Sequence, residues 1–277
     1  MKHAVLAAIG LLTAATVAGA QPAVIYDMGG KFDKSFNESA FNGAERWKKE
    51  TGKPYLDFEI SNEAQREQAM RRMADKGANP IIGVGFGQAS TMEKVAKDFP
   101  KLQFAIIDAV VKLPNVESVV FKEQEGSFLV GMMAALASKT GKVGFVGGMD
   151  IALIHKFEAG YRAGVKYVCP DCEVIVNYAG VTPEAFRNPG RGKEMALAMY
   201  NQGVNVIFHA SGSTGLGVFE AARTTGKLGI GVDADQYSEA PGHVLTSMVK
   251  GIDESVFQAA KAVQDGTFKG GIQQFGL

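Results

Sequence analysis

Four aspartates in this sequence each follow directly on an apolar segment that is predicted to be a β-strand. They are Asp27, Asp108, Asp150 and Asp233. The carboxyl ends of parallel strands meet at one edge of an α/β sheet, where small ligands bind. These carboxylates are therefore expected to converge on one cleft and to accept hydrogen bonds from hydroxyl groups, at about 1.5–3 kcal/mol each. An aspartate after a strand is also a common helix cap, so the case for a site depends on the convergence of all four.

The loop from Asp27 to Asn37 lies between a predicted strand and a predicted helix, and it contains several polar side chains. Ser35 is the expected N-cap of the helix, and Glu38 completes a capping-box spacing three positions later. Asp33 and Phe36 share this short loop with Asn37. Their clustering next to a helix N-terminus favours a ligand-binding loop over an ordinary strand-to-helix turn.

Four phenylalanines are candidates for stacking on a flat ligand, a contact that contributes about 1–3 kcal/mol per base. They are Phe36, Phe86, Phe157 and Phe208. Phe36 lies where the loop enters the helix, and we expect it to contact the ligand. Phe86 and Phe208 are expected to pack in the core.

The sequence offers little that supports an enzyme. His209 and Ser211 are close in sequence, but no G-x-S-x-G motif accompanies them. The glycine-rich segment 83–87 lacks the dinucleotide-binding spacing, and segment 212–217 lacks the lysine of a phosphate-binding loop. We therefore expect a binding protein without catalytic residues, cofactor or metal ion.

Predicted strands and helices alternate along the chain, a pattern typical of mainly parallel α/β sheets. The pattern restarts near Gly141, which predicts two similar lobes. Residues 21–123 and 246–277 are assigned to the first lobe and residues 124–245 to the second. Several short crossovers between the lobes would favour hinge closure around a ligand.

Residues 1–20 have the features of a secretory signal peptide, with a basic start, a short apolar run and an A-x-A cleavage motif. The apolar run is too short to span a bilayer comfortably, and no cysteine follows the motif. We expect an exported protein without a lipid anchor or membrane insertion. The chain carries 29 basic and 29 acidic residues, and this balance gives no support for binding to nucleic acid or to a membrane surface.

Cys169 and Cys172 are the two cysteines of the chain. In an exported protein, a pair with this spacing is more often a local disulfide than two free thiols. The pair appears between a helix and the following strand, whereas a redox-active C-x-x-C motif is expected where a strand enters a helix. We predict a structural disulfide.

Several motifs resemble those of the basic membrane protein family, the extracytoplasmic solute-binding proteins of ABC transporters that are similar to purine nucleoside receptors. The motifs are D-K-S-F-N at 33–37, F-x-x-x-E-G-S-F-L-V-G from Phe121, G-F-V-G-G-M-D at 144–150, S-G-S-T-G-L-G from Ser211 and G-V-D-A-D-Q at 231–236. The resemblance covers nearly the whole chain after the signal peptide. It implies a type I periplasmic-binding-protein fold, in which two Rossmann-like lobes joined by a hinge hold a nucleoside between them.

The resemblance also implies contacts with the base of the nucleoside. Asp33, Phe36 and Asn37 would contact the base, and Asp108 would hydrogen-bond to its edge. A second aromatic ring from the other lobe would complete the stack, and Phe157 and Phe208 are both candidates for this role.

The ribose would be held by Asp233, Lys250 and the backbone near Gly212, with Lys250 keeping a nearby Asp233 ionised. Many members of the family carry a lipoprotein cysteine that this chain lacks. The expected function is that of a periplasmic receptor that captures a purine nucleoside and delivers it to an inner-membrane ABC permease and its ATPase. The alternatives are a receptor for riboflavin or a sugar-like ligand, and a signalling receptor whose closed form engages a membrane sensor.

Overall fold

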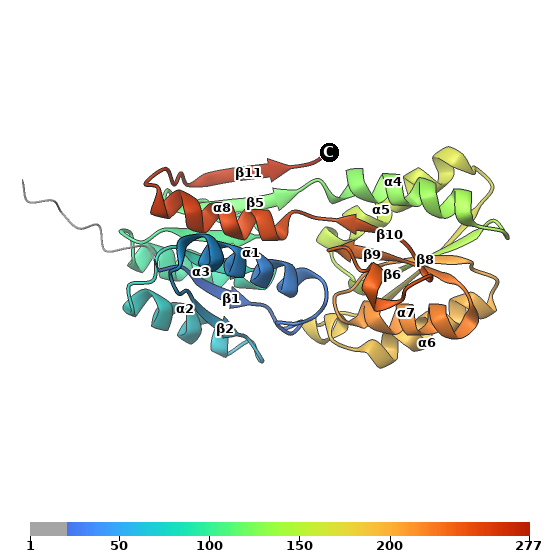
Figure 1. Ribbon diagram of the computed structural model, residues 1–277, viewed down its shortest axis with the longest axis horizontal. Coiled ribbons are helices and arrows are strands. Elements are labelled where there is room, and N and C mark those ends of the chain that lie inside the picture. Colours follow the sequence, from blue (N-terminus) through green and yellow to red (C-terminus); the bar gives the residue numbers. More distant parts are fainter. Residues whose placement is uncertain (1–20) are drawn as a thin grey trace, which may run out of the picture.

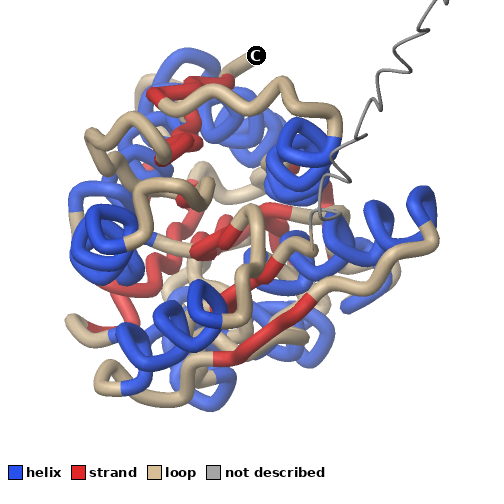
Figure 2. Tube along the Cα trace, turned by 90° about the vertical axis from the view of Figure 1, so that its left-hand side faces the viewer, coloured by secondary structure: helices blue, strands red, loops and turns tan. Residues whose placement is uncertain are grey.

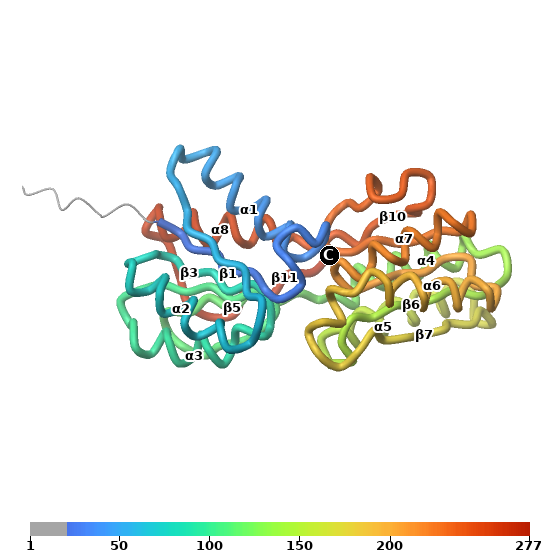
Figure 3. The backbone as a smooth tube through the Cα atoms, turned by 90° about the horizontal axis from the view of Figure 1, so that it is seen from below, coloured from blue at the N-terminus to red at the C-terminus, as the bar shows by residue number. Residues whose placement is uncertain are grey.

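The computed structural model describes residues 21–277, which form two lobes arranged along the long axis of the molecule (Figure 1). The predicted signal peptide, residues 1–20, lies outside the described residues. Viewed from below, the lobes are separate bodies joined at a narrow waist (Figure 3). The two-lobed organisation expected from the repeated strand–helix pattern is thereby confirmed.

The helices, strands and 3₁₀ turns divide between the lobes as follows. The first lobe contains β1 (Ala23–Tyr26), α1 (Phe36–Thr51), β2 (Leu56–Glu59), α2 (Gln65–Asp75), β3 (Ile81–Val84), η1 (Phe86–Gln88), α3 (Ala89–Asp98), β4 (Phe104–Ile107), β5 (Val116–Phe121), α8 (Ile252–Gln264) and β11 (Gly271–Phe275). The second lobe contains α4 (Glu123–Ala137), β6 (Lys142–Met149), α5 (Ala152–Val168), β7 (Glu173–Gly180), η2 (Pro183–Phe186), α6 (Pro189–Asn201), β8 (Val206–Ala210), α7 (Thr214–Thr225), β9 (Leu228–Asp233), η3 (Tyr237–Glu239) and β10 (Val244–Val249).

Each lobe is built on one parallel sheet. The strand order is β11-β5-β4-β3-β1-β2 in the first lobe and β10-β9-β8-β6-β7 in the second. All of the strand pairs are parallel. The carboxyl ends of both sets of strands therefore lie at one edge of each sheet, and the two edges face the boundary between the lobes.

Helices cover both faces of each sheet, and in Figure 2 they surround the strands. In the first lobe, Ala23 and Ile25 of β1 pack toward α2 and α3, whereas Val24 and Tyr26 pack toward α1 and α8. In the second lobe, α4 and α5 cover one face and α6 and α7 the other. Because both faces are buried, these strands are continuous apolar segments in the sequence.

Within residues 21–277, two segments cross between the lobes, at Lys122 between β5 and α4 and at residues 250–251 between β10 and α8. The sequence predicted that residues 246–277 belong to the first lobe, and this prediction is wrong for residues 246–249. Strand β10 pairs with β9 as far as Val249, opposite Asp233, so residues 246–249 belong to the second lobe.

Strand β11 was not predicted from the sequence. It pairs with β5 at the edge of the first sheet, and all five of its residues are exposed. An edge strand with no buried face lacks the apolar pattern by which the other strands were predicted.

The predicted disulfide between Cys169 and Cys172 is confirmed, and it joins the end of α5 to the start of β7. None of the helices in residues 21–277 has the length and apolar character that crossing a membrane requires.

Candidate functional site

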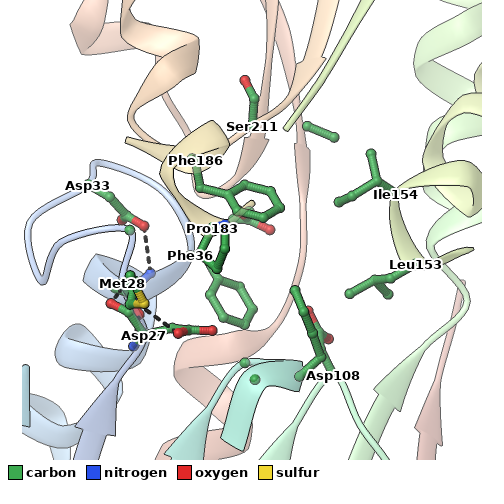
Figure 4. Close-up of a pocket in the computed structure, with 18 of the residues that line it drawn as sticks. Asp27, Met28, Asp33, Phe36, Asp108, Leu153, Ile154, Pro183, Phe186 and Ser211 are labelled. Carbon is green, nitrogen blue, oxygen red and sulfur yellow. Dashed lines mark hydrogen bonds between the residues drawn. The ribbon is translucent and has the colours of Figure 1, made fainter. Parts of the chain in front are cut away.

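A cavity of about 770 Å³, including its opening to solvent, lies between the lobes. The ends of β1 and β4, the η1 turn and the start of α1 line it from the first lobe. The ends of β8 and β9, the start of α5 and the η2 turn line it from the second (Figure 4). Its size is within the range of about 300–1,000 Å³ that is usual for small-molecule sites.

Three of the four predicted aspartates line this cavity, namely Asp27, Asp108 and Asp233. Asp150 does not, and the expected convergence is wrong for this residue. Its carboxylate is about half exposed and lies 2.8 Å from Nε2 of His155. The turn after β6 thus directs Asp150 to the surface of the second lobe.

Lys250, in the second crossover, lies among carboxylates from both lobes. Its Nζ donates to Asp108 Oδ2 at 2.6 Å and lies 3.5 Å from Glu123 Oε1, while its backbone N–H donates to the carbonyl of Asp233 at 2.9 Å. Burial lowers the pKa of Lys250, but the neighbouring carboxylates outweigh this effect and raise the pKa. The buried ammonium group therefore stays charged.

Asp108 directly follows β4 and Asp233 is the last residue of β9, and both have a left-handed backbone, with φ of 66° and 68°. Such a conformation costs about 1–3 kcal/mol and is typical of functional sites. Burial raises the pKa of Asp108 to about 6, although Lys250 acts in the opposite direction. Burial also raises the pKa of Asp233. Oδ1 of Asp108 is buried without a hydrogen-bond partner.

Aromatic rings from both lobes enter the cavity. Phe36 and Phe186 reach it from opposite lobes (Figure 4), and Phe86 and Phe157 also line it. The ammonium of Lys250 lies 5.3 Å from the ring centre of Phe36 and 5.4 Å from that of Phe157, within the range of a cation–π contact.

Phe208 does not reach the cavity. It is completely buried in β8, where its ring centre lies 5.6 Å from that of Phe145 and 5.4 Å from that of Tyr161. Of the two rings left open by the sequence, the structure places Phe157 at the cavity and Phe208 in the core. Phe86, which was expected in the core, lines the cavity instead.

Sequence reasoning missed Phe186, which lies in the short η2 turn after β7. A Cβ atom at Gly148 would lie 2.2 Å from Cε1 of Phe186, so the ring occupies space that only glycine leaves open. The pair of glycines at the end of β6 was the available signal, but it does not say which side chain fills the space.

Arg66 was also missed, because a charged residue near the start of a helix is normally exposed to solvent. Its side chain is only 4% exposed. Nη2 lies 2.7 Å from Asp27 Oδ1, and Nε and Nη2 donate to Glu63 at 2.8 and 3.0 Å. Nη1 is buried without a partner. Arg66, Asp27 and Glu63 all line the cavity.

Asp33 and Asn37 line the cavity, but their polar atoms bind the loop itself. The Asp33 carboxylate accepts from the backbone N–H groups of Ser35, Asn37 and Glu38 at 2.9–3.1 Å. Asn37 bonds to the backbone of Asp27. The predicted capping box is therefore wrong, since Asp33 caps α1 and the Ser35 side chain makes no capping bond. Burial raises the pKa of Asp33 to about 7, against the effect of these N–H donors.

Loops beside the cavity join the lobes directly. Ser35 Oγ donates to Asp233 Oδ2 at 2.5 Å, and Gln236 Nε2 donates to the carbonyl of Lys34 at 2.8 Å. Gly212, which lies two residues before α7 with φ of 57°, lines the cavity beside Ser211. These bonds show the lobes closed on one another.

Residues 20–277 match the family model described as "ABC transporter substrate-binding protein PnrA-like". The CD4+ T-cell-stimulating antigen of Listeria innocua is 38% identical over 92% of this chain and 77% of that protein. The ABC transporter nucleoside-binding protein BmpA of Lactococcus lactis is 35% identical over 90% of this chain and 76% of that protein. The crystal structure of an ABC transporter solute-binding protein from Aeropyrum pernix matches with a TM-score of 0.87 and 34% identity, covering 93% of this chain and 74% of that chain.

These matches agree with the two lobes, each built on a parallel sheet, and with the cavity between them. The expected type I periplasmic-binding-protein fold is confirmed. The family is one of binding proteins and not of enzymes, and its members serve an ABC permease with a small ligand. The chain belongs to the PnrA-like family of ABC transporter substrate-binding proteins.

Proposed function

We propose that this protein is a periplasmic receptor that binds a purine nucleoside between its lobes and delivers it to an inner-membrane ABC permease and its ATPase. The proposal rests mainly on the unpartnered Asp108 Oδ1, which lies beside the Lys250 ammonium in a cavity lined by aromatic rings. A hydroxylated ligand with a flat ring satisfies both features. The 35% identity to a protein named as nucleoside-binding supports the same ligand class.

The ribose lies at the Lys250 end of the cavity. Asp108 and Asp233 offer carboxylate acceptors to vicinal hydroxyl groups, and Lys250 offers a charged donor. The family resemblance assigned Asp108 to the edge of the base, but its 2.6 Å contact with Lys250 supports placing it with the ribose. The backbone near Gly212 completes this end.

The base lies between the rings of Phe36 and Phe186, which enter from opposite lobes (Figure 4). Phe157 flanks the same space from α5. Asp33 and Asn37 act indirectly, because their hydrogen bonds hold the loop that carries Phe36. Closure of the lobes therefore brings the two halves of the stack together.

The charge of the cavity favours an uncharged ligand. Five acidic side chains and two basic ones line it, and both basic groups are already paired with carboxylates. The acidic residues are Asp27, Asp33, Glu63, Asp108 and Asp233. A phosphate group would bring further negative charge to this site, so a nucleoside fits better than a nucleotide or a sugar phosphate.

Native mass spectrometry tests the proposal. The protein is measured as purified, and again after unfolding, refolding and addition of inosine, guanosine, adenosine, riboflavin or ribose singly. An adduct with a purine nucleoside, and none with ribose, is expected. Binding of riboflavin or ribose but of no nucleoside would overturn the proposal.

A further inference from the structure

We propose that Arg66 and Asp27 recognise the edge of the bound base and select 6-oxopurine nucleosides, such as inosine and guanosine, over adenosine. This inference depends on the proposed function, because it names the nucleosides that the same cavity takes. It assigns a role to two residues at the end of the cavity away from Lys250. In Figure 4, Asp27 and Asp108 lie on opposite sides of the Phe36 ring.

The first observation is an unused donor. Among the buried side-chain polar atoms of residues 21–277 that lack a partner, only Arg66 Nη1 and Asp108 Oδ1 belong to residues lining the cavity. Leaving a buried charged donor unpaired is unfavourable. An acceptor on the ligand would satisfy Nη1, as a ribose hydroxyl would satisfy Oδ1.

The second observation is that the guanidinium group is fixed in place. Glu63 and Asp27 hold two of its nitrogens, Nε and Nη2. A Cβ atom at Gly87 would lie 2.7 Å from Nη2 and 3.0 Å from Nη1 of Arg66, so the guanidinium packs closely against the backbone at this glycine. A donor held in this way is oriented before the ligand arrives.

The third observation is an acceptor beside this donor. Asp27 Oδ1 is occupied by Nη2 of Arg66 and by the backbone N–H of Met28 at 2.8 Å. Oδ2 is left for the ligand. Together the pair presents one donor and one acceptor, which matches a base edge that carries an acceptor next to a donor.

The depth of the two groups decides which purine fits. The Arg66 side chain is 4% exposed and that of Asp27 is 16% exposed, so the guanidinium is the more recessed. An exocyclic group projects beyond the ring and reaches the recessed partner first. In a 6-oxopurine that group is the acceptor O6, and the ring N1–H can donate to Asp27. In adenine the exocyclic group is an amine, which is a donor and would face the Arg66 donor.

Calorimetric titration of the full protein with inosine, adenosine and purine riboside tests this inference. Purine riboside has the same ring system without a substituent at C6. We expect inosine to bind wild-type protein at least about tenfold more tightly than either of the others, as the loss of one charged hydrogen bond predicts. Arg66→Met should weaken inosine binding by roughly 10- to 100-fold and leave purine riboside almost unchanged.

Arg71→Met is the matched control, because Arg71 lies on the same helix but pairs with Glu67 and Asp98 on the surface. It should leave all three affinities unchanged. Equal binding of adenosine and inosine by the wild-type protein would overturn the inference, as would equal losses of inosine and purine riboside in Arg66→Met. If Arg66→Met does not fold, the affinities of the wild-type protein for the three ligands still test the inference. Failure of every nucleoside to bind would instead overturn the proposed function.

Discussion

The Ser35 hydroxyl of the first lobe donates a hydrogen bond to Asp233 Oδ2 of the second lobe over 2.5 Å. Both residues are buried, and Asp233, the last residue of β9, lines the cavity. The bond joins the loop that carries Phe36 to a residue that we place at the ribose. The Asp233 carboxylate therefore takes part both in lobe closure and in the proposed binding of the ligand.

Ser35→Ala should weaken nucleoside binding by about tenfold, because closure loses one hydrogen bond to a charged group. Small-angle X-ray scattering of the ligand-free variant should show a larger radius of gyration than that of wild-type protein. Thr224→Ala is the control, since the Thr224 hydroxyl bonds only to the carbonyl of Glu220 within α7. Unchanged affinity and compactness in Ser35→Ala would show that this bond does not hold the lobes together.

Phe186→Ala and Phe208→Ala should have opposite effects. Phe186 lines the cavity, so its removal should cost about 1–3 kcal/mol of binding through lost stacking and change the stability of the ligand-free protein little. Phe208 is completely buried in β8, so its removal should lower the free energy of unfolding by about 3–5 kcal/mol. Urea unfolding and calorimetric titration of both variants separate the two roles. A large stability loss in Phe186→Ala would place that ring in the core.

Nucleoside affinity should decline as the pH falls below about 6. The raised pKa of Asp108 means that its carboxyl becomes protonated there and ceases to be a charged acceptor. The ligand binds the ionised form, so affinity is complete above this pKa and falls by up to about tenfold per pH unit below it. Asp108→Asn should bind more weakly at pH 8 and lose most of this dependence between pH 7 and pH 5. A variant as pH-dependent as the wild-type protein would assign the titration to another group, with Asp33 the first alternative.

Lys250→Met should lower the free energy of unfolding by about 3–5 kcal/mol at pH 8, because Asp108 and Asp233 stay buried without their cation. The pKa values of these carboxyls then rise further, so the folded state binds protons more tightly than the unfolded state. Stability should therefore increase as the pH falls from 8 to 5. Lys193→Met is the comparison, since Lys193 pairs with Glu220 and both side chains are more than a third exposed, and its loss should cost less than about 1 kcal/mol. Equal effects of the two substitutions would contradict the buried role of Lys250.

Inosine 5′-monophosphate should bind at least about 100-fold more weakly than inosine, because five carboxylates line the cavity and its two cations are already paired. Competition titrations with the two ligands measure the ratio directly. Comparable affinities would mean that the phosphate remains outside the cavity or meets a cation not identified among its lining residues.

The sequence predicted those parts of the molecule that depend on local pattern. Buried parallel strands are short apolar runs, and the aspartates at the ends of β1, β4 and β9 come to one cavity because the strands end at facing edges. Asp150 has the same local signal after β6. Its direction depends on the contact with His155, which sequence position does not reveal.

The features that the sequence did not predict depend on tertiary packing. Phe186 reaches the cavity because Gly148, almost forty positions earlier, leaves room for its ring. Arg66 is buried because the chain near Gly87 packs against it. Capping of α1 by Asp33 in place of Ser35 depends on the fold of the preceding loop, which also directs Ser35 toward the other lobe. None of these contacts leaves a periodic trace in the sequence.

Lys250 lies within a crossover between the lobes, whereas Gln236 and Lys34 meet through loops that belong to opposite lobes. Rotation about a hinge displaces atoms near the axis least. A hinge at the crossovers therefore leaves the ammonium of Lys250 close to its final position in an open form, and separates Gln236 from Lys34. Capture should follow two kinetic phases: a second-order encounter at the crossover, whose observed rate rises with ligand concentration, and a first-order closure, whose rate reaches a plateau.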